Sequence, residues 1–487
     1  MLKSIYFLYK DMCYTYHIII IMNTNTTDTE NSHDYLIDWT GNIIKNRYVM
    51  IKRVGRGSYA AVWTVYDAVD KKYCAIKIHN RDETKTAKKE QYFYEIIQKY
   101  NSPHIMSISR NFDHDTDDGD FNCSLMDLMA CSVFDIISSN KYKNGLPFDS
   151  VIKIIYQTLL GLKHFHQQNI VHGDIKPENL LVNGLSIAQE KLINLINIDE
   201  IYKNKKSNKG KHKKKNNDQN NTVNVDREVL AKYICSKINK TPHSSENDSD
   251  SNSDSDSVDS DYTSLNIFEC AYDESYSVNN CEHADSSDLS DDESVNSCVD
   301  KNGDIVSENS INNIHIKIAD MGYCVFLDKI KKTKIQTKHY RPPESILKIG
   351  FDLSSDIWAL GCVAYELLTG ELLFNPNNYD GNVFRHHIYI MIQKLGYIPH
   401  ELILNSPIKD VIFTTDMKLV KGYDNIIFHS AWNDINDVCN KNNVNASSIN
   451  KLIDLLTKML DYNPENRISV KSALQHSLFS NCNNFST

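Results

Sequence analysis

The chain has 487 residues, of which 41% are hydrophobic and 10% aromatic, so it can bury a core and is not disordered throughout. Glycine and proline are scarce, at 17 and 10 residues, which excludes collagen-like and proline-rich architectures. The 53 basic and 63 acidic side chains give a formal net charge of −10, so we expect no direct nucleic-acid partner. The 12 cysteines form no CxxC pair, which favours reduced thiols inside a cell over a disulfide framework.

The N-terminal 46 residues are expected to form a mostly flexible extension. Two short apolar runs, Ser4–Phe7 and Ile18–Ile21, are separated by charged residues and fall well short of the roughly 20 residues that cross a bilayer. No small-residue cleavage site follows them. Met22 precedes a polar tract and is an alternative start of translation. We therefore expect a soluble protein of the cytoplasm and/or nucleus, neither secreted nor transmembrane.

Residues 184–313 differ in composition from the sequence on either side. The segment opens with an apolar-periodic stretch, Ile187–Ile201, that could form one helix. A lysine-rich run, Lys203–Lys215, and an acidic serine run, Asp248–Asp261, follow. Such runs cannot bury enough apolar surface to become ordered, so we predict a largely disordered insertion within one folded domain. The basic run suits a nuclear-import signal, an anionic-surface patch or a solvated charge run without function.

Strand patterns come first in the chain and helix patterns later. Alternation or apolar runs predict three strands in residues 48–51, 61–66 and 73–78, and helical spacing predicts helices in residues 86–100, 148–165, 356–368, 387–395, 449–460 and 470–476. This order predicts an α+β fold of two lobes. The predicted parts are a strand-rich lobe in 47–129, a helical lobe in 130–183 and 314–480, and a tail in 481–487.

The most specific motif is His172–Asn179, which reads HGDIKPEN. It resembles the catalytic loop of protein kinases, and a loop that merely contains Asp and Asn is the alternative. The resemblance implies that Asp174 accepts the proton of the hydroxyl nucleophile and that Asn179 binds Mg²⁺. Lys176 would neutralise charge on the transferred phosphoryl group, a pattern of Ser/Thr rather than Tyr kinases.

A second motif resembles the glycine-rich loop that covers the phosphates of ATP. Its predicted contacts are Val54, Gly55, Arg56, Gly57, Ser58, Tyr59, Ala60, Ala61 and Val62. Two glycines allow close approach of a phosphate, whereas Ala60 stands in place of the usual third glycine. A plain hairpin with two glycines is the alternative.

The strand that follows ends in Ala75-Ile76-Lys77 and resembles the strand whose lysine binds the α- and β-phosphates. By the family's usual distance, Glu95 would hold Lys77 in place, with Glu90 as the fallback. An unpaired surface glutamate is the alternative for either residue.

The resemblance also implies an adenine site between the lobes. Met126 would be the gatekeeper, and the backbone of Asp127 and Met129 would bind the adenine edge. Val62, Ala75 and Leu181 would enclose the ring, although each could be an ordinary core residue.

Beyond the insertion, Asp320-Met321-Gly322 stands where protein kinases carry a metal-binding motif. Asp320 would therefore chelate Mg²⁺, although an isolated Asp-x-Gly is usually a turn. Three further residues have implied structural roles: Glu344 would pair with Arg467, and Asp356 would brace the backbone of the catalytic loop.

Three features resemble the SR-protein kinases, with the dual-specificity and Clk-like kinases as the near alternative. They are Trp63, the segment 317–322, and the position of the insertion between the catalytic loop and the metal motif. Such kinases phosphorylate arginine–serine repeats, which dock on an acidic stretch. Here the matching stretch, 377–387, holds Asp380 as its one acidic residue and also Arg385, which weakens the case for that substrate.

The sequence thus predicts a monomeric Ser/Thr protein kinase that uses ATP and Mg²⁺ on protein substrates, including basic or arginine–serine-rich ones, with no membrane partner. A pseudokinase scaffold whose insertion binds partners is the alternative, but Lys77, Asp174, Asn179 and Asp320 are all present. Gly173 stands where kinases switched on by phosphorylation usually carry an arginine. We therefore expect activity without a phosphate on the activation segment.

Overall fold

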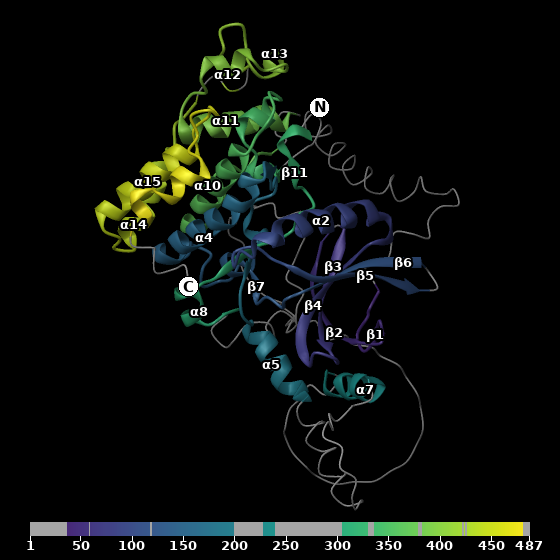
Figure 1. Cartoon of the computed structure of the whole chain (residues 1–487). Coiled ribbons are helices and arrows are strands. Elements are labelled where there is room, and N and C mark those ends of the chain that lie inside the picture. Colours follow the sequence, from purple (N-terminus) through teal and green to yellow (C-terminus); the bar gives the residue numbers. More distant parts are fainter. Residues whose placement is uncertain are drawn as a thin grey trace, which may run out of the picture.

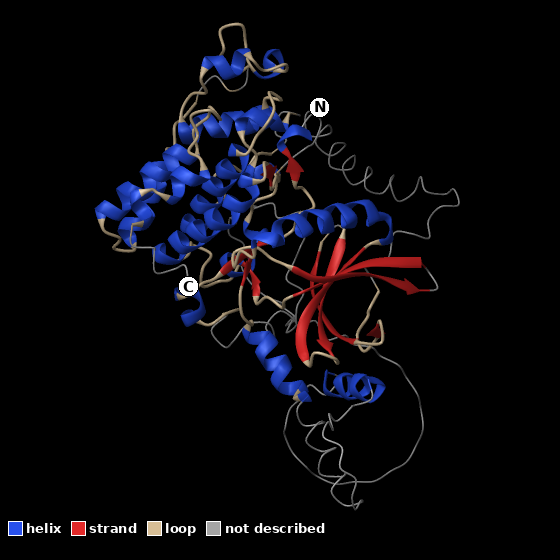
Figure 2. Cartoon of the chain, viewed as in Figure 1, coloured by secondary structure: helices blue, strands red, loops and turns tan. Residues whose placement is uncertain are grey.

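The computed structural model describes residues 37–57, 59–116, 119–198, 227–238, 304–329, 336–377, 382–420, 423 and 426–480. The strands of the main sheet gather in one lobe, and most helices form the other (Figures 1 and 2). The predicted α+β, two-lobed fold is confirmed. No helix among the described residues is both long and apolar enough to span a membrane.

The N-lobe is built on an antiparallel sheet with the strand order β1-β2-β3-β4-β6-β5. The strands are β1 (Ile43–Ile44), β2 (Tyr48–Arg56), β3 (Ala60–Asp67), β4 (Lys72–His79), β5 (Ile108–Thr116) and β6 (Gly119–Met126). One core of this lobe contains Met50, Trp63, Ile76 and Phe121. Helix α2 (Thr84–Ile97) packs on β5 and β6 and buries Phe93, Tyr94 and Ile97.

The end of the predicted flexible extension is part of this sheet, so that prediction is wrong for residues 37–46. Ile44 is fully buried, and β1 pairs with β2. Trp39 contacts Phe121 edge-to-face, with ring centroids 5.5 Å apart. Residues 1–36, including the alternative start at Met22, lie outside the described residues.

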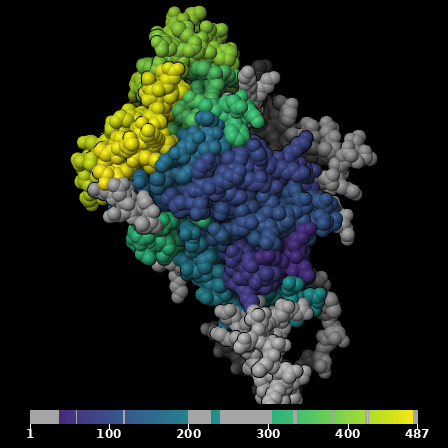
Figure 3. Space-filling view, in the orientation of Figure 1, coloured from purple at the N-terminus to yellow at the C-terminus, as the bar shows by residue number. Residues whose placement is uncertain are grey.

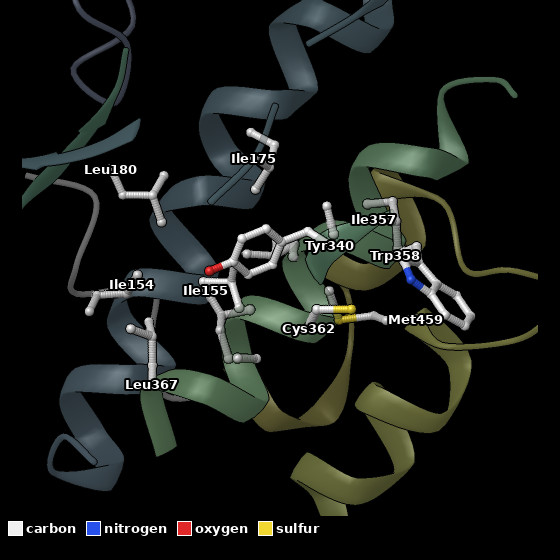
Figure 4. Close-up of a cluster of buried hydrophobic side chains, with 14 of the residues drawn as sticks. Ile154, Ile155, Ile175, Leu180, Tyr340, Ile357, Trp358, Cys362, Leu367 and Met459 are labelled. Carbon is white, nitrogen blue, oxygen red and sulfur yellow. The ribbon is translucent and has the colours of Figure 1, made fainter. Parts of the chain in front are cut away.

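The C-lobe is organised around α4 (Phe148–Gln167) and α10 (Ser354–Thr369). Helix α4 begins just after Pro147 and buries an apolar face that includes Ile154, Ile155 and Leu162, because residues three and four apart share one side of a helix. Figure 4 shows Ile154 and Ile155 in the same buried cluster as Trp358, Cys362 and Met459. The other helices of this lobe are α3 (Val133–Ile137), α9 (Pro343–Ile346), α11 (Val383–Leu395), α12 (His400–Leu404), α13 (Lys409–Ile412), α14 (Ala431–Lys441), α15 (Ala446–Met459) and α16 (Val470–Leu474).

Short strands where the lobes meet carry the catalytic segments. They are β7 (Cys131–Ser132), β8 (Ile170–Val171), β9 (Leu180–Val182), β10 (Ile316–Ile318) and β11 (Val325–Phe326). Strand β9 pairs with both β7 and β10, and β8 pairs with β11. The chain on either side of the insertion is therefore joined in one small sheet.

The described residues of the predicted insertion contribute three ordered helices, of which the first confirms the helix predicted in residues 187–201 and the other two were not predicted. The helices are α5 (Ile187–Ile196), α7 (Arg227–Ile238) and α8 (Glu308–Asn312). Helices α5 and α7 contact each other, and α7 packs on β1 and β2. Figure 3 shows teal atoms of the insertion beside the purple atoms of the first strands. The charged runs at 203–215 and 248–261 lie outside the described residues.

The two larger helices of the insertion are ordered by tertiary contact. Ile196, Leu230 and Ile234 are fully buried in one cluster with Val49 and Ile51 of the N-lobe sheet. Burial of such side chains is worth roughly 1.5–3 kcal/mol each. Local composition could not reveal this, because the partner surface is distant in sequence.

Candidate active site

Asp174 lies between β8 and β9, with its carboxylate held from both sides. Its Oδ2 accepts a hydrogen bond from Asn179 Nδ2 at 2.9 Å and lies 3.2 Å from Lys176 Nζ. Its Oδ1 accepts a bond of 2.9 Å from the Thr337 hydroxyl. Asp174 is only 3% exposed, so these donors stabilise a carboxylate that burial alone would disfavour. The three motif residues Asp174, Lys176 and Asn179 therefore lie in direct contact.

The loop backbone is braced by Asp356 of α10, as predicted. Asp356 Oδ2 accepts a bond from the His172 N–H, and Oδ1 accepts one from the Gly173 N–H, both at 2.9 Å. Gly173 has φ +77°, a left-handed conformation that glycine adopts without a Cβ clash. The implied pair of Glu344 with Arg467 is also present, at 2.9 and 3.0 Å.

The carboxylate that holds Lys77 is Glu90, and the prediction of Glu95 is wrong. Lys77 Nζ donates to both Glu90 carboxylate oxygens at 2.8 Å. Glu90 is buried, whereas Glu95 is exposed on the same helix. At about 100° per residue, five positions turn a side chain by roughly 140° from its starting face. The apolar pattern of α2 could have identified Glu90. It lies four residues before the buried Tyr94 and therefore on the same face of the helix.

The positions of Lys77 and Glu90 are reflected in their pKa values. Burial acts most strongly to lower the pKa of Lys77, but Asp320 and Glu90 outweigh it and the pKa is raised. For Glu90, burial acts to raise the pKa, but Lys77 and His79 outweigh it and the pKa is lowered. Both groups are therefore charged at neutral pH.

Asp320 sits at the start of the metal motif in the left-handed region, with φ +60°. This conformation is costly for a non-glycine residue and is a feature of functional sites. Its N–H donates to the Tyr94 hydroxyl oxygen at 3.2 Å, and its Oδ1 lies 3.6 Å from Lys77 Nζ. Burial acts to raise the pKa of Asp320, but Lys77 and the Gly322 N–H are among the groups that lower it overall.

The metal motif and the catalytic loop are directly connected. The Ala319 N–H donates to Asn179 O at 2.9 Å. Asn179 donates through Nδ2 to both the backbone and the side chain of Asp174, so Oδ1 is the end of the amide that these bonds do not use. A carboxylate oxygen and an amide oxygen are ligands that Mg²⁺ accepts, so Asp320 and Asn179 fit this ion.

The glycine-rich loop joins β2 and β3, and its turn is closed by a bond of 2.8 Å from the Gly57 N–H to Ala60 O. A Cβ added at Gly55 or Gly57 would meet only ordinary contacts, at 3.9 and 3.7 Å. The protein's own packing therefore does not require glycine there, whereas a closely approaching phosphate does. Ala60 remains in the strand and pairs with His79. Ser58 lies outside the described residues.

The predicted adenine residues converge where the lobes meet. Ala75 pairs with Met126 across β4 and β6. Ala75 and Met126 are buried in the large core cluster, and the half-buried Val62 and Leu181 pack against it. Residues 127–129, the hinge segment, follow β6 directly.

Sequence reasoning missed that the insertion reaches the hinge segment. Gln189 of α5 is buried, and its Nε2 donates to Met129 O at 2.8 Å. Its Oε1 accepts a bond from the Ser186 N–H at 2.9 Å, which caps the helix. The only available signal was the capping pattern Ser186-x-x-Gln189.

Comparison with known proteins agrees with this geometry. The family model described as the protein kinase domain matches residues 48–196 and 301–479. A protein of Acanthamoeba polyphaga mimivirus, named as a serine/threonine-protein kinase, is 28% identical over 407 residues, which cover 74% of each chain. Protein kinase dsk1 of Schizosaccharomyces pombe is 27% identical over 443 residues, covering 86% of this chain and 78% of dsk1. Serine/threonine-protein kinase SRPK of Physarum polycephalum is 23% identical over 449 residues, covering 90% of this chain and 86% of SRPK. The chain belongs to the protein kinase family, and its kinase domain is split by an insertion.

Proposed function

We propose that this protein transfers the γ-phosphate of ATP to serine and threonine hydroxyls of protein substrates, with Asp174 as the catalytic base. The observation that carries the proposal is the set of donors around the Asp174 carboxylate, which includes Lys176 and Asn179. The relatives named as serine/threonine kinases support the choice of acceptor.

The chain's own residues supply positioning and charge. Asp174 Oδ1 already accepts a hydroxyl donor, Thr337 Oγ1, so a substrate hydroxyl can be oriented by the same carboxylate and lose its proton to it. Lys176, 3.3 Å from the Thr337 hydroxyl, provides positive charge where the phosphoryl group passes. Lys77 would hold the α- and β-phosphates, and Asp320 with Asn179 would hold Mg²⁺. The ion, when bound, offsets negative charge on the phosphates.

The charge around the catalytic loop favours basic substrates. Glu178 has a carboxyl oxygen that is buried without a hydrogen-bond partner among the described residues. Burial raises its pKa and outweighs Lys176, which lowers it, while Asp174 and Asp135 add to the effect of burial. A cationic side chain from a substrate would satisfy such a cluster. The stretch 377–387 gives less support, since Arg385 lies there and donates to Val411 O at 3.0 Å.

Activity without phosphorylation forms part of the proposal. Helix α2 is bound to the metal motif by two hydrogen bonds that need no phosphate: Lys89 Nζ donates to Gly322 O at 2.8 Å, and the Asp320 N–H donates to Tyr94 Oη. Gly173 offers no side chain to bind a phosphate. Residues 330–335, which include Thr333, lie outside the described residues. We place the activity inside the cell, where ATP is available.

The test is phosphate transfer from labelled ATP by protein made in bacteria and treated with phosphatase. The acceptors are an arginine-rich serine peptide and a matched acidic peptide. We expect transfer to the basic peptide at a rate at least tenfold above the acidic one. Asp174→Asn should lower kcat by roughly 10²–10⁴-fold, the usual contribution of a general base.

The control is nucleotide binding by Asp174→Asn, which should persist because Lys77 and the adenine site are intact. Absence of transfer in the unaltered protein, with nucleotide binding retained, would favour the pseudokinase scaffold. If transfer requires a phosphate on the activation segment, the proposal of activity without phosphorylation would be refuted, whereas the proposed kinase activity would stand.

A further inference from the structure

A buried histidine shares the carboxylate that anchors Lys77. His79 ends β4, two residues after Lys77, and is 1% exposed. Its Nε2 lies 2.9 Å from Glu90 Oε2, the oxygen that Lys77 Nζ also contacts at 2.8 Å. The two side chains lie on the same face of the strand because residues i and i+2 do. Glu90 therefore receives two donors from β4.

The chemistry of the pair assigns the hydrogen to Nε2. Glu90 is ionised and can only accept hydrogen bonds, so the ring atom facing it must carry the proton. The other ring atom, Nδ1, is buried and has no hydrogen-bond partner among the described residues. The bond to Glu90 is thus the contact that orients the ring.

This second donor matters because Lys77 has competing partners. Lys77 Nζ already lies 3.6 Å from Asp320 Oδ1, and in the proposed function it also binds nucleotide phosphates. Whenever the Lys77 ammonium moves toward these groups, the buried Glu90 carboxylate would lose part of the positive charge that stabilises it. His79 is less able to move in this way, because its short side chain is 1% exposed and its backbone pairs with Ala60 where β4 ends.

We propose that His79 is a positioning residue, which holds Glu90, and through it helix α2 and Lys77, in the arrangement that binds nucleotide. This inference rests on the proposed function. In this role His79 acts through Glu90, its hydrogen-bond partner, and not by binding the nucleotide or the acceptor itself. The role is specific to the sequence Lys77-Ile78-His79, since an apolar residue at the last position would leave Glu90 with the lysine alone.

The experiment compares His79→Leu, which keeps bulk but removes the donor, with His79→Gln, whose amide can donate from a similar position. The readouts are the Kd of an Mg²⁺–ATP analogue by calorimetry, KM for ATP, kcat, and the melting temperature without nucleotide. We expect His79→Leu to weaken nucleotide binding about tenfold or more, as loss of a hydrogen bond to a buried charge predicts. His79→Gln should restore most of the lost affinity.

A double-mutant cycle with Lys77→Met distinguishes an effect of His79 on the position of Lys77 from an effect on the packing of the N-lobe. If His79 acts through Lys77, the effect of His79→Leu on Kd should fall below about threefold in the Lys77→Met background, because coupled residues are not additive. Should His79→Leu fail to fold, His79→Asn replaces it, since the shorter amide cannot reach Glu90.

Unchanged nucleotide affinity in both His79→Leu and His79→Asn would overturn the inference. An equal loss with and without Lys77 would also overturn it, as a packing effect predicts that result. Neither outcome would touch the proposed function, which fails only if the unaltered protein binds nucleotide but transfers no phosphate.

Discussion

Two buried ion pairs, one in each lobe, have similar geometry and different surroundings. In the C-lobe, Arg467 binds Glu344 through two bonds of 2.9 and 3.0 Å, and their side chains are 0% and 3% exposed. Arg467 also donates to the backbone oxygens of Ser354 and Asp461. In the N-lobe, Lys77 is 17% exposed and also approaches Asp320.

We infer that the C-lobe pair supports the fold, whereas the N-lobe pair supports one arrangement of the active site. Arg467 joins segments that are all enclosed by the main core, so the pair is fixed once the lobe folds. The pair of Lys77 and Glu90 joins the N-lobe sheet to the single helix α2, whose other bonds include those to the metal motif. Movement of α2 would break this second pair without unfolding the protein.

The largest expected effect is on the C-lobe pair. Arg467→Met should destabilise the protein by about 3–5 kcal/mol, because Glu344 would remain as a buried charge without its partner. Denaturant unfolding measures this. The control is Lys458→Met, which breaks the exposed pair with Asp454 and should cost about 1 kcal/mol or less. Equal effects of the two substitutions would show that burial does not distinguish these pairs.

The second effect is on activity rather than stability. Glu90→Gln should lower kcat/KM for ATP by roughly 10–100-fold, because Lys77 loses its anchoring charge. Glu95→Gln, on the exposed face of the same helix, should stay within about twofold of the unaltered enzyme. Steady-state kinetics with varied ATP give both values. The reverse ranking would restore Glu95 as the partner of Lys77.

The smallest effect concerns a C-lobe carboxyl that belongs to neither pair. Burial raises the pKa of Glu366 from its ordinary value of 4.5 to about 8, and Glu178 adds to the shift. The folded state then keeps a proton that the unfolded chain releases, so stability falls as pH rises from about 4.5 to about 8. Over one pH unit the free energy of unfolding falls by at most about 1.4 kcal/mol.

Thermal unfolding at pH values of about 7 and 8 measures this loss. Glu366→Gln keeps an uncharged acceptor for the Tyr340 hydroxyl, which lies 2.7 Å from the carboxyl, and should remove this part of the pH dependence. An identical pH slope in the variant would place the titration elsewhere.

The sequence was most informative where chemistry needs fixed residues at short spacing. Asp174, Lys176 and Asn179 lie within six consecutive residues, and in the structure Lys176 and Asn179 both contact the Asp174 carboxylate. The brace from Asp356 and the pair of Glu344 with Arg467 were also predicted, since each belongs to its own motif. The strands and helices with clear periodicity were predicted within a few residues.

The failures occurred where position depends on a distant surface. Counting from Lys77 gave Glu95, but the face that α2 turns toward the sheet selects Glu90. Residues 227–238 have little local signal for order, yet Leu230 is fully buried on the N-lobe. The link from Gln189 to the hinge segment connects residues 60 positions apart.

By itself, then, the sequence determined the motifs, the two-lobed fold and which residues are candidates for catalysis, because these depend on residue type and local spacing. Only the tertiary structure decided which glutamate anchors Lys77, that His79 shares it, and which parts of the insertion join the domain. Those choices depend on which faces of distant elements meet, and burial of apolar side chains drives that meeting without leaving a local pattern.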